Sequence, residues 1–279
     1  MRDFSQDTNA LSLNTATLGH NVDGYGAGWT CEQVIDACAA RGYGGIVFWQ
    51  REVTDPVALG LRTRAAGLRI DGLCRTPYLT GREAGSDDAI KQTIDTAAGL
   101  GAPVVTIVTG GTDPGHKGVM ESRKRLCDRL AWAVDYAAEH DINLALEPLN
   151  PMFGGNRTCL FTAADALAIC DAIDHHRLGI AIDVYHVWWD TTLAASLASA
   201  KGRIFGFHLC DWLENTNDML LDRGMMGDGV ADLKGIRRIV ENMGYSGPCE
   251  VEVFSSRHWW TRPPNEVLDI VKTRFCQVC

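Results

Sequence analysis

The chain has 279 residues, of which 46% are hydrophobic and 22% charged, as is ordinary for a globular protein with a sizeable core. Its formal net charge of −9 and its pI of about 5.3 argue against a nucleic-acid binder, which needs a positive surface to displace counterions from phosphates. No apolar run approaches the roughly 18 residues that cross a bilayer, and the first residues lack the apolar stretch of a secretory signal, so we expect a cytoplasmic protein.

Short apolar runs alternate with amphipathic segments along the whole chain. Several runs are nearly continuous in apolar character, which is typical of a parallel strand that is buried on both faces. In chain order, the predicted strands are residues 10–15, 45–49, 68–74, 104–108, 143–147, 179–183, 204–210 and 249–254.

The segments between these runs have helical periodicity and helix boundary signals. Thr30 and Gln33 have the spacing of a capping box. Gly42, Gly101 and Gly244 each follow a periodic stretch, where a left-handed residue ends a helix. The predicted helices are residues 30–41, 56–66, 87–100, 117–139, 162–173, 191–200, 232–242 and 264–275.

This alternation predicts an α/β fold with a parallel sheet. A doubly wound open sheet also alternates, but eight repeats in under 280 residues, without a Gly-x-Gly-x-x-Gly after the first strand, favour a closed barrel. Because no linker or low-complexity stretch interrupts the chain, we expect a single (β/α)8 TIM-barrel domain over residues 1–279.

Four consecutive predicted strands end in or near an ionisable side chain, at the end of a barrel where active sites form. These side chains are Glu147, Asp183, His208 and Glu252. A charged group in an apolar strand is costly unless it is paired or metal-bound, and converging carboxylates repel one another. A divalent ion resolves both problems, and three oxygens with one nitrogen suit Mn²⁺, Mg²⁺, Co²⁺ or Zn²⁺.

Each of these residues alone has a simpler interpretation. A strand-ending Glu is more often a helix cap or a surface salt bridge than a metal ligand, and only the four together favour the metal. Glu250 shares a face with Glu252, one layer nearer the strand start. We expect it to meet solvent or a salt bridge near the bottom of the barrel, although a register error would exchange it for Glu252.

Two further side chains are candidates for substrate contacts. His186, on a predicted loop three residues after Asp183, either packs under aromatic side chains or points into the pocket, and we favour the pocket. Arg223 lies in the long glycine-rich connection after strand seven, where it either holds a substrate oxygen or is a solvated surface residue. The weaker candidates are Trp49, Asn14, Asn150, His20, Arg75, Arg257 and Trp259.

The ten cysteines give no reason to expect a disulfide framework, since most lie in apolar or helical stretches where a free Cys behaves as a small hydrophobe. Cys276 and Cys279 have redox or metal-ligand spacing. We expect them on a frayed C-terminal tail, where such a pair is weak evidence of a function.

From end to end, the chain resembles the xylose-isomerase-like sugar phosphate isomerase/epimerase superfamily. Its second half looks closest to the inosose isomerases and the ketose 3-epimerases. The resemblance is carried by Leu-Glu147-Pro-Leu-Asn, Gly-Ile-Ala-Ile-Asp183-Val-Tyr-His186, Phe-His208-Leu-Cys-Asp211, Asp-Arg223-Gly-Met-Met-Gly-Asp-Gly, and Gly-Tyr-Ser-Gly-Pro-Cys-Glu-Val-Glu252-Val-Phe.

The resemblance implies roles for the strand-end residues. The implied metal ligands are Glu147, Asp183, His208 and Glu252. It also implies that Glu147 and Glu252 act as the acid/base pair on opposite faces of the substrate, and that His186 and Arg223 contact substrate oxygens. Where many relatives have a Glu on strand two, this chain has Trp49. The resemblance therefore does not assign the residues that contact the substrate on that side.

These observations together predict a divalent-metal-dependent isomerase or epimerase of a small ketose, inosose or related polyol, acting by proton transfer through an enediolate. The same ligands also serve a dehydratase acting on a keto-sugar or cyclic keto acid, and a non-catalytic sugar-binding subunit is the rival of another kind. A nuclease of this superfamily needs three zinc ions, more histidines and a basic surface, so the negative net charge of this chain argues against a nuclease.

The expected partner is a small polyhydroxylated substrate, and a homodimer or homotetramer is compatible with the many rim aromatics.

Overall fold

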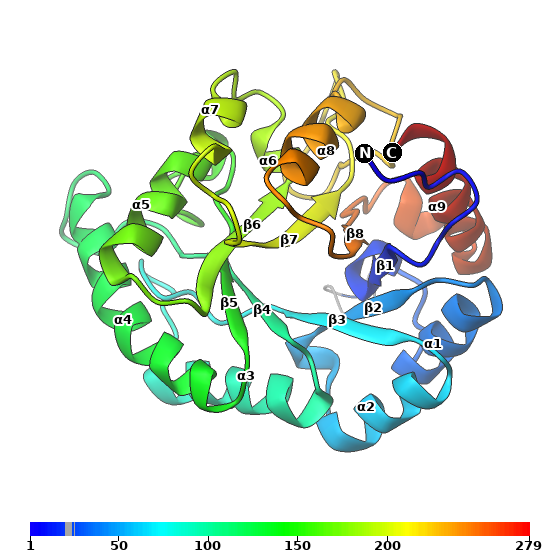
Figure 1. Cartoon of the computed structure of the whole chain (residues 1–279), viewed down its shortest axis with the longest axis horizontal. Coiled ribbons are helices and arrows are strands. Elements are labelled where there is room, and N and C mark those ends of the chain that lie inside the picture. Colours follow the sequence, from blue (N-terminus) through cyan, green and yellow to red (C-terminus); the bar gives the residue numbers. More distant parts are fainter. Residues whose placement is uncertain (20–23, 25) are drawn as a thin grey trace.

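In the computed structural model, eight parallel strands close into one barrel in chain order, and helices surround it (Figure 1). The structure describes residues 1–19, 24 and 26–279. The strands are β1 Leu11–Asn14, β2 Gly45–Trp49, β3 Arg69–Cys74, β4 Val104–Ile107, β5 Asn143–Leu146, β6 Leu178–Asp183, β7 Ile204–Leu209 and β8 Cys249–Val251. The predicted (β/α)8 barrel is confirmed.

Helices form the outer layer. Over the described residues they are α1 Cys31–Ala40, α2 Pro56–Ala65, α3 Asp87–Leu100, α4 Met120–Glu139, α5 Ala163–Ile173, α6 Val184–Val187, α7 Leu193–Leu197, α8 Leu233–Asn242 and α9 Pro264–Val278. None of these helices combines the length and the apolar character that crossing a membrane requires.

The predicted boundary signals work as helix caps. The Thr30 hydroxyl accepts a hydrogen bond from the Gln33 backbone N–H, and the Gln33 side chain accepts one from the Thr30 backbone N–H, so the capping box at α1 is confirmed. Gly101 ends α3 with φ of 79°, a left-handed conformation that favours glycine.

Two elements differ from the sequence prediction because of side chains near the strand ends. The Asp183 carboxylate accepts a hydrogen bond from the Tyr185 backbone N–H at 2.8 Å, so the short helix α6 begins directly after β6, where a loop was predicted. The predicted strand 249–254 ends at Val251, so Glu252 lies just beyond β8.

The prediction of a frayed C-terminal tail is wrong. Helix α9 continues to Val278, and Cys279 is buried. The buried Arg237 guanidinium donates a hydrogen bond to the Cys279 carbonyl oxygen at 2.5 Å and lies 4.0 Å from the Phe4 ring centroid. The first and last residues are therefore held together, and the two chain ends lie close to each other in Figure 1.

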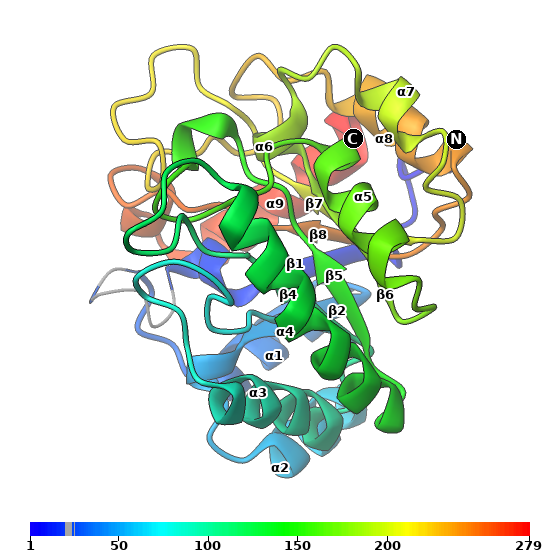
Figure 2. The same cartoon turned by 90° about the vertical axis from the view of Figure 1, so that its left-hand side faces the viewer.

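The long connections that follow the strands gather at one end of the barrel. In Figure 2, residues 75–86 (cyan) and 211–232 (yellow) project to the same side of the molecule. Because the barrel is parallel, this is the end where the carboxyl termini of all eight strands lie.

Candidate metal centre and substrate cavity

Four side chains meet at the carboxyl ends of neighbouring strands. Glu147 follows β5, Asp183 ends β6, His208 lies in β7 and Glu252 follows β8. One ligand atom from each lies within 4.8 Å of the ligand atoms of the other three, and all four residues are buried. The structure thus brings together all four residues that the sequence singled out as ligands.

Strand register explains why these side chains meet. Asp183 is the register partner of His208, and His208 is the partner of Glu250. Since side chains alternate along a strand, Glu252 faces the same side as Glu250, one layer higher. Glu250 is buried and pairs with His208 in the barrel interior, so the expectation of solvent, or of a salt bridge near the barrel bottom, is wrong.

His208 lies between two carboxylates. Its Nδ1 is 2.7 Å from Oε1 of Glu147, and its Nε2 is 3.2 Å from Oε2 of Glu250. Burial lowers the pKa of His208, but the charges of Glu250 and Glu147 outweigh burial and leave that pKa well above its ordinary value. Each ring nitrogen thus lies within hydrogen-bond distance of a carboxylate oxygen, which favours the protonated imidazole.

The carboxylates show that the cluster lacks positive charge. Burial, together with the nearby charges of Glu147 and Asp183, raises the pKa of Glu252 to about 8, even though Arg223 opposes the shift. Burial also acts to raise the pKa of Glu147, but the hydrogen bond and charge of His208 lower it overall. A divalent cation would supply the missing charge, and the ligand atoms match what such ions accept.

Arg223 is part of the cluster and not a surface residue. Its Nη1 donates hydrogen bonds to Oδ2 of Asp183 at 2.9 Å and to Oε2 of Glu252 at 3.2 Å. Its guanidinium lies 4.4 Å from the Tyr185 ring centroid and 4.7 Å from that of Phe254. The solvated interpretation of Arg223 is therefore wrong, because the side chain is buried between two rings and two carboxylates.

His186 lies on α6 and lines the cavity next to the cluster. Its Nδ1 accepts a hydrogen bond from the Asn150 backbone N–H at 3.3 Å, so the neutral ring carries its proton on Nε2. Burial lowers the pKa of His186 to about 4. Its edge-to-face contact with Phe153 fixes the ring, so His186 both packs against an aromatic side chain and lines the cavity.

Asn14 and Trp49 support the cluster from β1 and β2. The Asn14 amide donates hydrogen bonds to Glu250 at 2.6 Å and to Glu252 at 3.0 Å, and its oxygen accepts one from Trp49 Nε1 at 2.9 Å. Trp49 lines the cavity, whereas Asn14 is not among the lining residues. A direct contact between Asn14 and a substrate stays a prediction.

The cavity next to the cluster has a charged and an apolar part. The charged and polar lining residues are Trp49, Cys74, Arg75, Glu147, Arg157, His186, Arg223 and Glu252, and the apolar ones are Val108, Leu149, Phe153, Leu220 and Phe254. Sequence reasoning missed Arg157. The signal that would have found it is the long connection between β5 and α5, which starts at the active-site end of the barrel.

The remaining rim candidates lie elsewhere. Arg257 is exposed, Trp259 is buried, and neither lines the cavity. Asn150 contributes its backbone N–H to His186. His20 lies outside the described residues.

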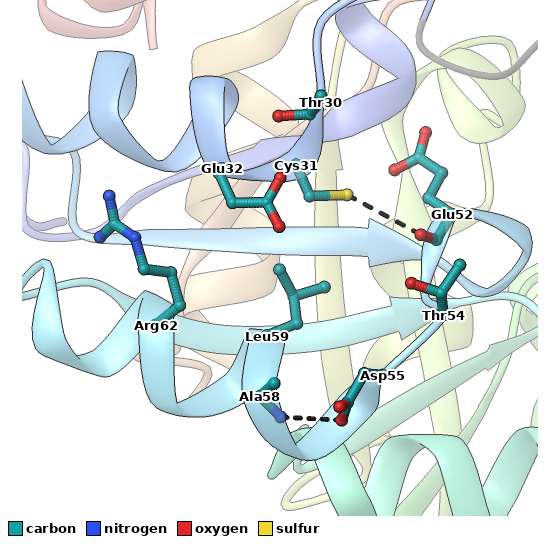
Figure 3. Close-up of a pocket in the computed structure, with 9 residues that line it drawn as sticks. All are labelled: Thr30, Cys31, Glu32, Glu52, Thr54, Asp55, Ala58, Leu59 and Arg62. Atoms are coloured by element: carbon teal, nitrogen blue, oxygen red, sulfur yellow. Dashed lines mark hydrogen bonds between the residues drawn. The ribbon is translucent and has the colours of Figure 1, made fainter.

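A larger cavity of about 420 Å³ lies away from the cluster, between the first turns of α1 and α2 (Figure 3). Its walls carry three acidic side chains, Glu32, Glu52 and Asp55. Burial and the charge of Glu52 raise the pKa of the Cys31 thiol to about 12, so this thiol is not a reactive nucleophile. We assign no catalytic role to this cavity.

Comparisons with known proteins agree with this fold. A family model described as xylose isomerase-like TIM barrel matches residues 35–272. An L-ribulose-5-phosphate 3-epimerase of Salmonella paratyphi A is 22% identical over 237 residues, which cover 81% of this chain and 76% of that protein. An inosose isomerase of Halalkalibacterium halodurans is 27% identical over 185 residues, which cover 63% of each chain.

Solved structures share the fold over nearly the whole chain. The protein SMc04130 of Sinorhizobium meliloti 1021 is 39% identical and superposes with a TM-score of 0.90, covering 98% of this chain and 99% of that one. A structure of the IolI protein with a bound zinc atom is 19% identical, with a TM-score of 0.81 and coverage of 96% and 97%.

Proposed function

Because this chain belongs to the xylose isomerase-like TIM barrel family, we propose that it is a divalent-metal-dependent isomerase or epimerase. Its substrate would be a small ketose, inosose or related polyol carbonyl compound. The observation that carries the proposal is the buried group of Glu147, Asp183, His208 and Glu252, whose ligand atoms lie within 4.8 Å of one another. The sugar epimerase and the inosose isomerase among its relatives support this class of reaction.

These four residues would hold the cation. Three carboxylates and one imidazole suit Mn²⁺, Zn²⁺, Mg²⁺ or Co²⁺. The raised pKa of Glu252 reflects the lack of the positive charge that such an ion would supply. The structure of the IolI protein, which has the same fold, holds a zinc atom, and this supports a metal in the present chain. When bound, the ion is a Lewis acid that polarises a carbonyl and stabilises the enediolate that proton removal forms.

Glu147 and Glu252 would move the proton. They approach the cavity from β5 and β8, two strands that are not neighbours in the barrel, so they can reach the substrate from different sides. One carboxylate removes the proton next to the carbonyl, and the other returns a proton. Return to the same carbon from the other face gives an epimer, and return to the neighbouring carbon gives an isomer.

His186 and Arg223 would hold the substrate oxygens. His186 is neutral and presents its Nε2–H, since its Nδ1 is occupied by a backbone donor. Arg223 is fixed by two carboxylates and two rings, so its charge is positioned before a substrate arrives.

A dehydratase would use the same ligands and differ only in the loss of a β-hydroxyl. The names of the two curated relatives favour isomerisation or epimerisation over this reaction. A sugar-binding subunit without catalysis would have no need for two carboxylates facing the substrate cavity.

The proposal is tested by metal analysis of the purified protein, followed by NMR in D₂O with ketoses, inososes and keto acids. We expect about one equivalent of a divalent metal and deuterium uptake at a single carbon of one substrate. Absence of exchange with every compound while metal is bound would overturn the proposal.

A further inference from the structure

The substrate cavity has a cationic part that the proton transfer proposed above does not use. Arg75 follows β3, and Arg157 lies in the connection between β5 and α5. Both line the cavity that also contains Glu147 and Glu252. The cavity of this acidic protein therefore has carboxylates at the metal centre and two arginines elsewhere on its wall.

Among the described residues, the Arg75 guanidinium has few hydrogen-bond partners. Its guanidinium lies 4.3 Å from the centroid of the Tyr78 ring, and Nη1 donates to the Thr76 carbonyl oxygen at 3.0 Å. A guanidinium has five N–H donors in a planar fork, so stacking on Tyr78 leaves its edge available to a ligand.

Arg157 is anchored through its backbone. Its N–H donates to the Phe153 carbonyl oxygen at 3.1 Å, and its own carbonyl oxygen accepts from the Gly110 N–H at 3.0 Å. The guanidinium lies 5.9 Å from the Phe153 ring centroid. Burial lowers the pKa of Arg157, and the charges of Arg75 and Arg223 lower it further, although Tyr78 opposes them.

Neither arginine has an anionic partner among the described residues. No carboxylate oxygen in that part of the chain lies within 4.0 Å of either guanidinium, whereas the nearby Arg129 and Arg125 each pair with an aspartate. Two half-buried cations that face one cavity repel each other and lose hydration, and both costs are offset when an anion binds between them.

We propose that Arg75 and Arg157 bind an oxyanion of the substrate, a phosphate ester or a carboxylate, at the end away from the reacting carbonyl. This inference rests on the proposed function, since it takes the metal centre as the place of the carbonyl. A planar guanidinium matches two oxygens of a phosphate or carboxylate, and two guanidiniums that line one cavity can both donate to such a group. The substrate is therefore an anionic keto-sugar or keto-polyol.

The experiment compares matched probes by isothermal titration calorimetry on the metal-loaded protein. D-Ribulose 5-phosphate is measured against D-ribulose, and 5-keto-D-gluconate against L-sorbose. We expect the anionic member of at least one pair to bind about tenfold or more tightly than its neutral partner, in keeping with one or two charge-assisted hydrogen bonds. The pair that shows the preference identifies the phosphate ester or the carboxylate as the source.

The variants Arg75→Met, Arg157→Met and their combination should reduce that preference, to within about threefold in the double variant. Lysine at both positions should restore part of it. The control is Arg257→Met, which removes one positive charge from the exposed rim without touching the cavity. Equal binding of anionic and neutral probes, or a preference that survives in the double variant, would overturn the inference.

The proposed isomerase activity and the proposed oxyanion site can each be refuted without the other. Deuterium exchange into a neutral ketose without any preference for the anionic probes would leave the isomerase standing and remove the oxyanion site. Charge-dependent binding without exchange in any anionic or neutral compound would leave the oxyanion site and remove the isomerase.

Discussion

The Nε2 atom of His208 lies 3.2 Å from Oε2 of Glu250, a carboxylate one layer below the four candidate ligands. This contact fixes a proton on Nε2, so Nδ1 is the nitrogen that can bind a metal once it loses its own proton. A carboxylate that holds the far nitrogen of a ligand histidine orients the ring and makes it a better ligand.

Replacing Glu250 should therefore weaken metal binding without unfolding the protein. In Glu250→Gln, the amide oxygen still accepts a hydrogen bond, but the negative charge behind His208 is lost. We expect the metal dissociation constant, measured by competition with a chelator, to rise by about 10- to 100-fold. Glu266→Gln, an exposed change on α9, is the control, and an unchanged dissociation constant for the Glu250 variant would show that the contact does not support the metal.

Metal binding should strengthen as pH rises. In the metal-free protein the pKa of Glu252 is about 8 and that of His208 is well above its ordinary value, so both groups are protonated at lower pH. Each group must lose its proton to become a ligand, so metal binding releases protons. For each proton released, the metal affinity therefore falls by up to about tenfold for every unit by which the pH is lowered. Calorimetry at pH 6, 7 and 8 in buffers of different ionisation enthalpy measures the release, and binding without protons released would contradict this charge distribution.

Arg223→Met should destabilise the metal-free protein more than the metal-loaded protein. The change leaves Asp183 and Glu252 buried without their shared cation, which costs about 3–5 kcal/mol of unfolding free energy. A bound divalent ion takes over part of that compensation, so the loss should be smaller in the metal-loaded protein. Denaturant unfolding with and without metal measures both values, with Arg223→Lys as the charge-conserving control. Equal losses in the two states would mean that Arg223 and the ion do not share the same carboxylates.

Arg237→Leu should lower stability and leave the metal centre intact. The guanidinium holds the Cys279 carbonyl oxygen and packs on Phe4, and its removal costs about 2–4 kcal/mol of unfolding free energy. Glu241, which loses this partner, still pairs with Arg2. Arg238→Leu changes the exposed neighbour on the same helix and should have little effect, whereas similar losses for the two variants would show that the buried contacts contribute nothing.

The sequence was sufficient for the barrel and for the four strand-end residues, because a parallel barrel places the carboxyl ends of all its strands at one edge. It was insufficient for residues whose partners lie on distant strands. The sequence alone suggests that Glu250 is a surface residue, and only the strand register shows that it lies beside His208. The sequence places Arg223 in a long connection but does not show its carboxylate partners, Asp183 and Glu252.

Helix α6 and Arg157 show a second limit of sequence reasoning. A one-turn helix gives no periodic pattern, and here its start is capped by a hydrogen bond from the Tyr185 N–H to Asp183. Arg157 is one of several cations in long connections, and the sequence does not show the backbone bonds to Phe153 and Gly110 that hold it beside the cavity.

Asn14 joins the first two strands to the last one. Its amide can be oriented in only one way, because its nitrogen faces two carboxylates and its oxygen faces the Trp49 indole N–H. A change at position 14 would remove a hydrogen-bond partner from Glu250 and from the Trp49 indole at the same time. Descendants of this chain that replace Asn14 should therefore also change positions 49 and 250, whereas a change at either of those positions alone leaves Asn14 with other partners.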